Sequence, residues 1–349
     1  MSNASAREQL LLELINRARL DPKAEAKRFG ISLNDSLTPG TLNAKAKQPL
    51  AMNDLLLKAA DGHSDWMLDK DLFQHEPGRG GSDPGDRITD EGYTLGPGST
   101  WGENISWNGT SGNVNATQAI FTHHEGLFKS SGHRRNMLND DFQEAGIGQK
   151  LGKFTSPTTG TTWNASMTTE KFASDGSGDI FITGVFYRDK DGDEFYDVGE
   201  GQTGTVRAAG DSDRSGDAGG YALAIDPKKS QTVKLKAGGK EAVVKVDAQE
   251  NVKLDFVDGK EVYSSADTEL VSGAKTAKLL GVANLDLDGS SSAEKLTGNK
   301  GNNDITGGGG KDRLFGKSGN DDLSGQKGND VLKGGSGKDT LNGGSGNDK

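Results

Sequence analysis

The sequence contains no cysteine, so neither disulfides nor thiolate metal ligands can contribute to its structure. Hydrophobic residues make up only 31% of the chain, and no run approaches the ~18 apolar residues of a transmembrane segment. Residues 1–7 lack the apolar core of a signal peptide. The net charge of −10 argues against nucleic acid and anionic membranes as partners. Glycine, by contrast, is abundant at 52 of 349 residues, which indicates several modules rather than one compact domain.

Nine-residue units fill residues 298–349, five of them complete and a sixth represented by its first seven residues. Each unit opens with a glycine, and a second glycine follows three residues later. An acidic or amide residue comes two positions after that, and in all but the last unit an aliphatic residue follows two positions further on. The spacing is the G-G-x-G-x-D-x-U-x pattern of a calcium-binding parallel β-roll. The expected calcium-binding side chains are Asn303, Asp312, Asp321, Asp330, Asp339 and Asp348.

This pattern has a physical explanation. Glycine permits the positive φ of a tight turn, and carboxylate and carbonyl oxygens around such a turn can surround a hard cation. Aspartates stacked about 5 Å apart, the spacing of neighbouring strands, repel one another until calcium lies between them. Calcium binding and folding are therefore expected to be one event. The alternative, a disordered glycine-rich tail, would not keep one register through six units.

The remaining chain divides by pattern. Residues 1–173 mix helices with later strands. Ser5 and Glu8 form a capping box, Asn53 is a helix N-cap, a third helix is expected from about Asn115, and strands are expected at 145–149 and 163–171. A Ser/Asp/Gly linker follows. Alternating apolar residues then predict a small β-sandwich over 179–258, a junction over 259–284 and the roll over 285–349. The expected fold class is multidomain α+β.

Residues 189–200 read DKDGDEFYDVGE and predict a calcium loop inside the β-sandwich. Oxygen ligands fall at loop positions 1, 3, 5, 7, 9 and 12, the 7th being a backbone carbonyl. Glu194 stands at position 6, where such loops carry glycine, and no helices flank the loop. It resembles the calcium loop of B-type repeats in bacterial surface adhesins. The simpler alternative is a solvated acidic turn. The expected ligands are Asp189, Asp191, Asp193, Phe195, Asp197 and Glu200.

Six short strings in the N-terminal part carry a second resemblance: NRAR at 16–19, LFQHEPG at 72–78, RITDEGY at 87–93, WGENIS at 101–106, SSGHRRNML at 130–138 and EAGIG at 144–148. Together they resemble the bacterial branch of the CAP superfamily (the SCP-like domain). That resemblance implies an α-β-α sandwich over roughly residues 8–172.

The resemblance also implies a cleft with two histidines and two glutamates, which match His75, Glu103, Glu125 and His133. Glu125 lacks the tryptophan that usually precedes it. Two imidazoles can bind zinc with carboxylates orienting them. The alternatives are a hydrogen-bonded structural clamp and an incidental metal site.

Other polar residues in this region are expected to be structural. His63 is expected on the buried face of its helix rather than as a ligand. His123 and His124 cannot both face the cleft, and one is expected to be exposed. Arg134 and Arg135 are expected to be solvated.

Three functions remain open. The favoured one is a secreted bacterial calcium-binding protein whose cleft binds an unidentified ligand or cell-surface partner; the resemblance allows lipid. The second is a metal-dependent hydrolase or peptidase with Glu103 or Glu125 as base. The third is a structural adhesin. The repeats resemble the RTX family, which implies one-step (type I) export, with a C-terminal signal either missing or beyond Lys349.

Overall fold

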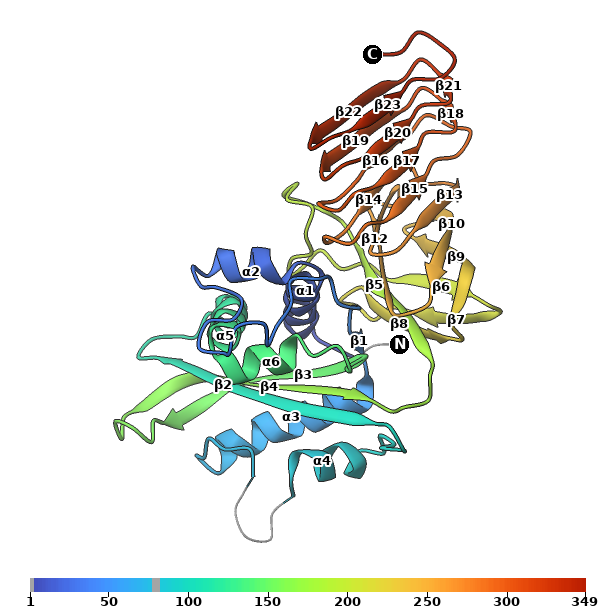
Figure 1. The fold of residues 1–349 in the computed structure, drawn as a ribbon. Coiled ribbons are helices and arrows are strands. Elements are labelled where there is room, and N and C mark those ends of the chain that lie inside the picture. The colour runs from blue at the N-terminus through green and yellow to red at the C-terminus, as the bar shows by residue number, and fades with distance from the viewer. Residues whose placement is uncertain (1–2, 77–81) are drawn as a thin grey trace. The chain divides into compact units, whose positions relative to one another are not determined.

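The structure is a computed structural model that describes residues 3–76 and 82–349, so Pro77 and Gly78 of the LFQHEPG string lie outside the described residues. The chain forms two compact units that divide between Gly178 and Asp179. Figure 1 shows the helices confined to the first unit, and strands building the second.

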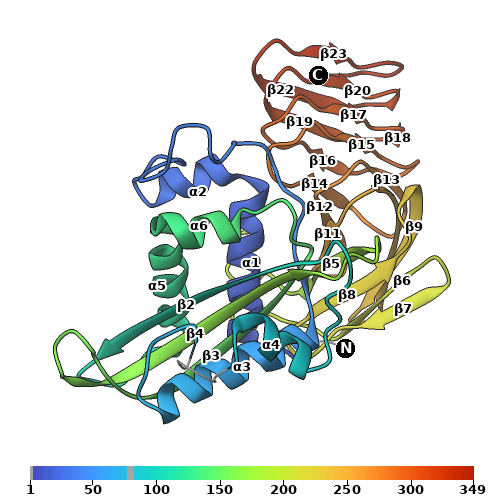
Figure 2. The same cartoon turned by 60° about the horizontal axis from the view of Figure 1, so that its bottom comes forward.

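The N-terminal unit is an α-β-α sandwich, as expected. Its four-stranded sheet has the order β1-β3-β4-β2, with β1 parallel to β3 and the other pairs antiparallel. Helices α3 and α4 lie on one side of the sheet, and α1, α2, α5 and α6 on the other (Figure 2). The elements are α1 (Ala6–Leu20), α2 (Pro22–Arg28), β1 (Ala51–Met52), α3 (Asp54–Asp69), α4 (Pro84–Asp90), β2 (Thr100–Thr110), α5 (Ala116–Lys129), α6 (Ser131–Met137), β3 (Glu144–Thr155) and β4 (Thr162–Ser174).

Two glycines of the EAGIG string let α3 lie directly on the sheet. A Cβ on Gly146 would collide with the backbone of Leu56, and one on Gly148 would lie 2.5 Å from the backbone nitrogen of Asp61. Only glycine therefore allows helix and strand backbones to approach this closely. The string that carried the family resemblance thus has a packing role at the centre of the unit.

The helix starts read from the sequence are confirmed. Ser5 and Glu8 form the capping box of α1, Asn53 caps α3, and Asn115 caps α5. Strands β3 and β4 cover both predicted strand segments. The short helices α2 and α4 and the strands β1 and β2 were not predicted, because each lacks a clear run of periodic apolar residues.

The C-terminal unit consists of two long sheets that face each other, plus the short pair β18-β21. One sheet has the order β23-β20-β17-β15-β13-β10-β9-β6-β7 and the other β22-β19-β16-β14-β12-β11-β5-β8. The strands are β5 (Ile180–Tyr187), β6 (Gly204–Ala208), β7 (Asp211–Arg214), β8 (Gly220–Ile225), β9 (Lys228–Ala237), β10 (Lys240–Ala248), β11 (Val252–Val257), β12 (Glu261–Ser264), β13 (Thr268–Ser272), β14 (Thr276–Leu279), β15 (Asp286–Asp288), β16 (Lys295–Thr297), β17 (Asp304–Thr306), β18 (Gly309–Gly310), β19 (Arg313–Ser318), β20 (Asp322–Ser324), β21 (Lys327–Gly328), β22 (Val331–Ser336) and β23 (Thr340–Asn342).

Both sheets run without interruption from the sandwich strands into the roll. Residues 259–284, where a junction was expected, form β12, β13 and β14. Strand β13 pairs antiparallel with β10 and parallel with β15, and β12 pairs antiparallel with β11 and parallel with β14. One hydrophobic core extends from Ile180 to Leu323. The sandwich therefore supplies the base on which the coils stack.

The aliphatic residues of the repeats stack inward, as the pattern predicted. Leu287, Ile305 and Leu323 are aligned on successive coils of one sheet and are fully buried. Leu296 and Leu314 form the equivalent column in the other sheet. Two consecutive nonapeptides thus make one full turn of the roll, and each turn contributes one apolar side chain to each sheet. Toward the C-terminus the burial ends: Leu332 is partly buried and Leu341 is 48% exposed.

Candidate functional site

The turns of the roll gather oxygen atoms around glycines. A Cβ on Gly307 would lie 2.7 Å from the Asp312 Oδ2 atom and 3.0 Å from the carbonyl oxygen of Gly325. On Gly325 a Cβ would meet Asp330 Oδ2 at 2.5 Å and the carbonyl oxygen of Gly343 at 2.6 Å. A larger residue would fill each of these cradles, so the glycines keep space beside a carboxylate and a carbonyl oxygen.

The two oxygens of each turn aspartate have different roles. Asp330 Oδ1 accepts a hydrogen bond from the backbone N–H of Asp312 at 2.8 Å, and Asp339 Oδ1 accepts one from Asp321 at 3.1 Å. The Oδ2 atoms of Asp312, Asp321 and Asp330 are buried and have no hydrogen-bond partner. Buried carboxylate oxygens without a partner are costly, and a hard cation that prefers oxygen ligands would satisfy them.

Electrostatics support the same conclusion. Burial, together with the charges of Glu294 and Asp330, raises the pKa of Asp312 to about 6. Burial and the charge of Asp339 raise the pKa of Asp321. Stacked carboxylates thus destabilise one another, and calcium between them would supply the missing positive charge. The residues present therefore fit calcium.

The first repeat differs from those that follow. Asn303 donates from Nδ2 to the carbonyl oxygen of Leu285 (3.0 Å) and to Asn299 Oδ1 (3.2 Å). Its own Oδ1 accepts from the backbone N–H of Asn299 at 2.9 Å. The neutral amide of Asn303 therefore has protein partners for both of its polar atoms, whereas the buried Oδ2 atoms of Asp312, Asp321 and Asp330 have none. At the far end, Asp348 accepts from the backbone N–H of Asp330 at 2.9 Å.

The loop at 189–200 brings three of its predicted ligands together. Carboxylate oxygens of Asp189, Asp191 and Asp193 lie within 4.8 Å of one another. Burial and these three charges raise the pKa of Asp197, and burial followed by the charges of Asp191 and Asp189 raises that of Glu200. All five carboxylates therefore surround one region of negative potential. Phe195 donates its backbone N–H to Asp193 Oδ1 at 2.8 Å.

Glu194 adopts the conformation that glycine normally provides at this position of the loop. Its φ is +63°, in the left-handed region, and its N–H donates to Asp189 Oδ2 at 3.0 Å. The Glu194 carboxylate forms a 2.6 Å ion pair with Lys278 on β14. This contact fixes the loop to the first strands of the roll and explains how a non-glycine residue is kept here.

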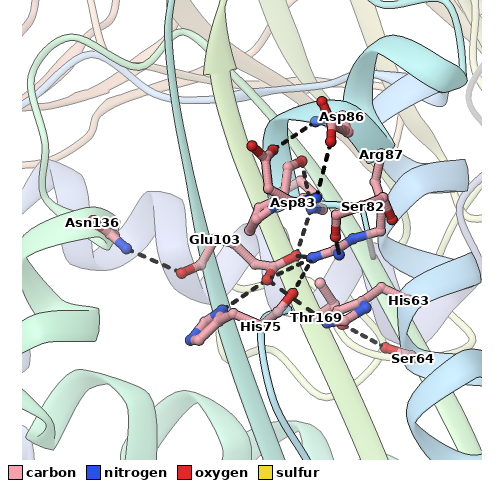
Figure 3. Close-up of polar contacts among 12 residues, drawn as sticks. His63, Ser64, His75, Ser82, Asp83, Asp86, Arg87, Glu103, Asn136 and Thr169 are labelled. Atoms are coloured by element: carbon pink, nitrogen blue, oxygen red, sulfur yellow. Dashed lines mark hydrogen bonds and ion pairs between the residues drawn. The ribbon is translucent and has the colours of Figure 1, made fainter. Parts of the chain in front are cut away.

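In the N-terminal unit, Glu103 on β2 lies at the centre of a buried charge cluster (Figure 3). Its side chain is 1% exposed and contacts His75 Nδ1 at 2.8 Å, Arg87 Nη2 at 2.9 Å and Lys171 Nζ at 2.5 Å. His63 Nε2 lies 3.7 Å away. Burial raises the pKa of Glu103, but the hydrogen bond from His75 and the charges of Lys171, His63 and Arg87 together lower it to about 2.

The other two predicted cleft residues are placed differently. Burial lowers the pKa of His133 on α6, and the charge of the nearby His75 lowers it further. Glu125 on α5 is half exposed and forms an ion pair with Lys129 at 2.5 Å. Within the described part of the chain, no hydrogen bond or ion pair joins Glu125 to His75, Glu103 or His133. The structure thus places His75 against Glu103 and His133 near His75, and turns Glu125 toward solvent.

The structure gives no support for zinc in this cleft. The Glu103 carboxylate already receives N–H donors from two cationic side chains and one imidazole, so its lone pairs are occupied and its charge is compensated. Glu125 is directed elsewhere. Among residues 3–76 and 82–349, the only group of three or more possible metal-ligating side chains is Asp189, Asp191 and Asp193.

A cavity of about 200 Å³ lies beside this charge cluster. It is lined by Gly62, His63, Trp66, Ser82 and Arg87, and the rings of His63 and Trp66 stack with their centroids 5.6 Å apart. Burial is the largest effect on His63 and lowers its pKa to about 4, although the charge of Glu103 acts in the opposite direction. The cavity is therefore walled by a neutral imidazole, an indole and a guanidinium.

Sequence reasoning missed Arg87 and Lys171 as cleft residues. Lys171 had a signal, because it stands beside Glu170 within a strand whose residues 165–174 are all buried. A charged residue in such a run requires a partner. Arg87 opens the RITDEGY string but carried no signal of its position.

One expectation about the neighbouring residues is confirmed and two need correction. His63 is buried as expected, but it faces Glu103. Both His123 and His124 are buried, because α5 is covered on two sides: His123 contacts Ser106, Ser166 and Asn108, while His124 contacts Glu25. Arg134 is also buried rather than solvated, because its guanidinium donates to the backbone carbonyl oxygens of Leu33, Asp35, Phe128 and Lys129.

Comparison with known families agrees with the two resemblances. Residues 12–156 match the cysteine-rich secretory protein (CAP) family, and residues 288–323 and 315–349 match the RTX calcium-binding nonapeptide repeat. The chain therefore contains a CAP domain, here without cysteine, followed by RTX calcium-binding repeats. No helix in the described residues is long and apolar enough to cross a membrane.

Two solved structures with some similarity come from bacteria. An outer surface protein from Borrelia burgdorferi is 15% identical over 36% of this chain and 77% of its own, with a TM-score of 0.26. An extracellular protein containing an SCP domain from Bacillus anthracis is 25% identical over 36% of this chain, with a TM-score of 0.23. This chain covers 34% of that protein. No curated protein gives a match.

Proposed function

We propose that this chain is a secreted bacterial calcium-binding protein whose roll folds on calcium and whose CAP domain binds a ligand or cell-surface partner. The proposal rests chiefly on the buried, unpartnered Oδ2 atoms of Asp312, Asp321 and Asp330. Calcium outside the cell reaches the ~0.1–1 mM range in which extracellular calcium modules bind. Type I export, which the RTX family uses, would deliver the chain to that calcium before the roll folds.

Two adjacent aspartates provide a matched test of the roll. Asp321 is buried with one unpartnered oxygen, whereas its neighbour Asp322 is exposed. We expect Asp321→Ala to weaken the calcium-induced gain in β signal measured by circular dichroism, while Asp322→Ala leaves it unchanged. Equal behaviour of the two variants, or full β signal in chelator, would refute calcium-driven folding.

We infer that the loop at 189–200 is a further calcium site. The convergence of Asp189, Asp191 and Asp193 supports this, as do the raised pKa values of Asp197 and Glu200. Isothermal titration of Asp191→Asn should show one site fewer than the unaltered chain. An unchanged number of sites would mean that the loop is only an acidic turn.

For the CAP domain we propose binding rather than hydrolysis. A metal hydrolase needs open coordination positions and a free base, whereas Glu103 is held by Arg87, Lys171 and His75. The cavity beside His63 is smaller than the ~300–1,000 Å³ of typical ligand pockets and would suit a headgroup or a single side chain.

The alternatives are separable by experiment. Turnover of peptide or ester substrates that is lost in His75→Ala would favour the hydrolase. Adhesion of cells or surfaces that survives Ser82→Trp, which would fill the cavity, would favour a structural adhesin. Loss of partner binding in Ser82→Trp with an unchanged fold is the result we expect.

A further inference from the structure

The outward-facing residues of the roll are sorted by charge. On the sheet containing β15, β17 and β20, the residues flanking the buried aliphatic column include four exposed aspartates; this acidic face consists of Asp286, Asp288, Asp304 and Asp322. On the opposite sheet, the equivalent positions of β14, β16, β19 and β22 carry only cations among their charged residues. This basic face consists of Lys278, Lys295, Arg313 and Lys333.

The strand register stacks these like charges directly on one another. Asp286, Asp304 and Asp322 are aligned on consecutive strands, and Lys295 is aligned with Arg313. Neighbouring strands lie about 4.8 Å apart. Like charges directly opposite one another destabilise a sheet, so both columns work against the fold. Burial, followed by the charges of Asp267 and Asp304, raises the pKa of Asp286, which is consistent with this crowding.

Charges at the base of the same two sheets are paired, in contrast to those on the coils. Glu269 on β13 forms an ion pair with Lys245 on β10 at 2.8 Å, and Lys278 is paired with Glu194. Beyond the base, and within the residues that the structure describes, no ion pair involves any of the four aspartates of the acidic face. The same holds for Lys295, Arg313 and Lys333, so the coils keep seven charges available to a partner.

Calcium does not remove this asymmetry. The turn aspartates, such as Asp312 and Asp321, lie just before the strands and are buried. The acidic face is made of different, exposed side chains, one residue further along each repeat for Asp286, Asp304 and Asp322 and three residues further for Asp288. Filling the turns with calcium would therefore leave two flat faces of opposite sign on the folded roll.

We propose that the acidic face of one roll binds the basic face of a second copy of this chain. Charge complementarity supports this occupant, because the two faces present opposite charges at the same coil-to-coil spacing. Two successive carboxylates of one copy can therefore meet the two aligned cations of another, Lys295 and Arg313. The contact joins two different surfaces, so a bound pair leaves one acidic and one basic face free and assembly can continue into a row.

Charge-reversed variants of the full chain test the proposal in several millimolar calcium. The basic-face variant is Lys295→Glu with Arg313→Glu, and the acidic-face variant is Asp304→Lys with Asp322→Lys. Sedimentation velocity should show concentration-dependent assembly of the unaltered chain at about 10 mM salt and monomer at about 1 M, where charges are screened beyond about 3 Å. Each variant alone should be monomeric, and a mixture of the two should assemble again.

Several outcomes would overturn the proposal. The unaltered chain could remain monomeric at every concentration, assembly could survive in both variants, or a mixture of the two variants could fail to assemble. The unaltered chain could also remain monomeric and bind polyphosphate, with this binding lost only in the basic-face variant. That result would assign the basic face to an anionic polymer instead. Circular dichroism in calcium checks folding separately from assembly, so failure of calcium-induced folding is distinguishable. If reversal prevents folding, Lys295→Gln with Arg313→Gln replaces it, and assembly unchanged in this neutral variant would refute the proposal.

Discussion

Replacing Lys171 by methionine tests whether the buried charge cluster stabilises the CAP domain. The Lys171 side chain has no exposed surface, and its Nζ contacts Glu103 at 2.5 Å and the carbonyl oxygen of Pro84 at 3.0 Å. Removing one partner of a buried ion pair costs about 3–5 kcal/mol. Glu103 keeps Arg87 and His75, so we expect the lower end, about 3 kcal/mol. For a unit of this size that lowers Tm by about 6–12 °C.

The measurement is thermal and urea unfolding of the full chain, followed by a signal from the CAP domain such as tryptophan fluorescence. Lys129→Met is the matched control, because Lys129 forms an equally short pair with Glu125 but both side chains are nearly half exposed. That exposed pair should contribute less than about 1 kcal/mol. If Lys171→Met costs no more than Lys129→Met, the cluster around Glu103 does not stabilise the fold as we argue.

Three further predictions concern pH, packing and the first coil. The pKa of Glu103 falls from its ordinary 4.5 to about 2 on folding, so its contribution, about 3 kcal/mol, is present above pH 4.5 and is lost as the pH falls toward 2. Urea midpoints from pH 6 to 2 should show a smaller acid dependence in Glu103→Gln. Gly146→Ala should lower the free energy of unfolding by at least about 3 kcal/mol, because the new Cβ meets the α3 backbone. Gly126→Ala on α5 is its control: the space around Gly126 is open, so that variant should be neutral or stabilising. Asn303→Asp should make the first coil depend on calcium, seen as lower Tm in chelator and unchanged Tm in calcium; equal Tm values in chelator would contradict the amide's role.

Local and periodic features were predictable from sequence. The capping residues Ser5, Asn53 and Asn115 define helix starts through hydrogen bonds to nearby backbone, and the nonapeptide register directly encodes the stacking of Leu296 on Leu314. The matched positions of the CAP strings identified Glu103 and His75, but not their surroundings. Arg87 and Lys171 reach Glu103 from distant segments, and such encounters depend on tertiary packing rather than on spacing.

The continuity of sandwich and roll was hidden for a related reason. Residues 259–284 contain short strands without clear alternation, and their pairing changes from antiparallel to parallel within a few residues. The opposite signs of the two faces, however, are present in the sequence, because the charged residues that flank the aliphatic residue alternate in sign between consecutive repeats. The alternation becomes visible only once the register assigns odd and even repeats to different sheets.

The unbroken pair of sheets also bears on how such a chain can change length during evolution. Because the sandwich already offers two strand edges, a new coil needs only to add to an existing edge, and insertion or loss of 18 residues would extend or shorten the stack while preserving which side is acidic. A change of nine residues would instead exchange the sides for every coil beyond it. Descendants that keep one acidic and one basic side should therefore differ by even numbers of repeats.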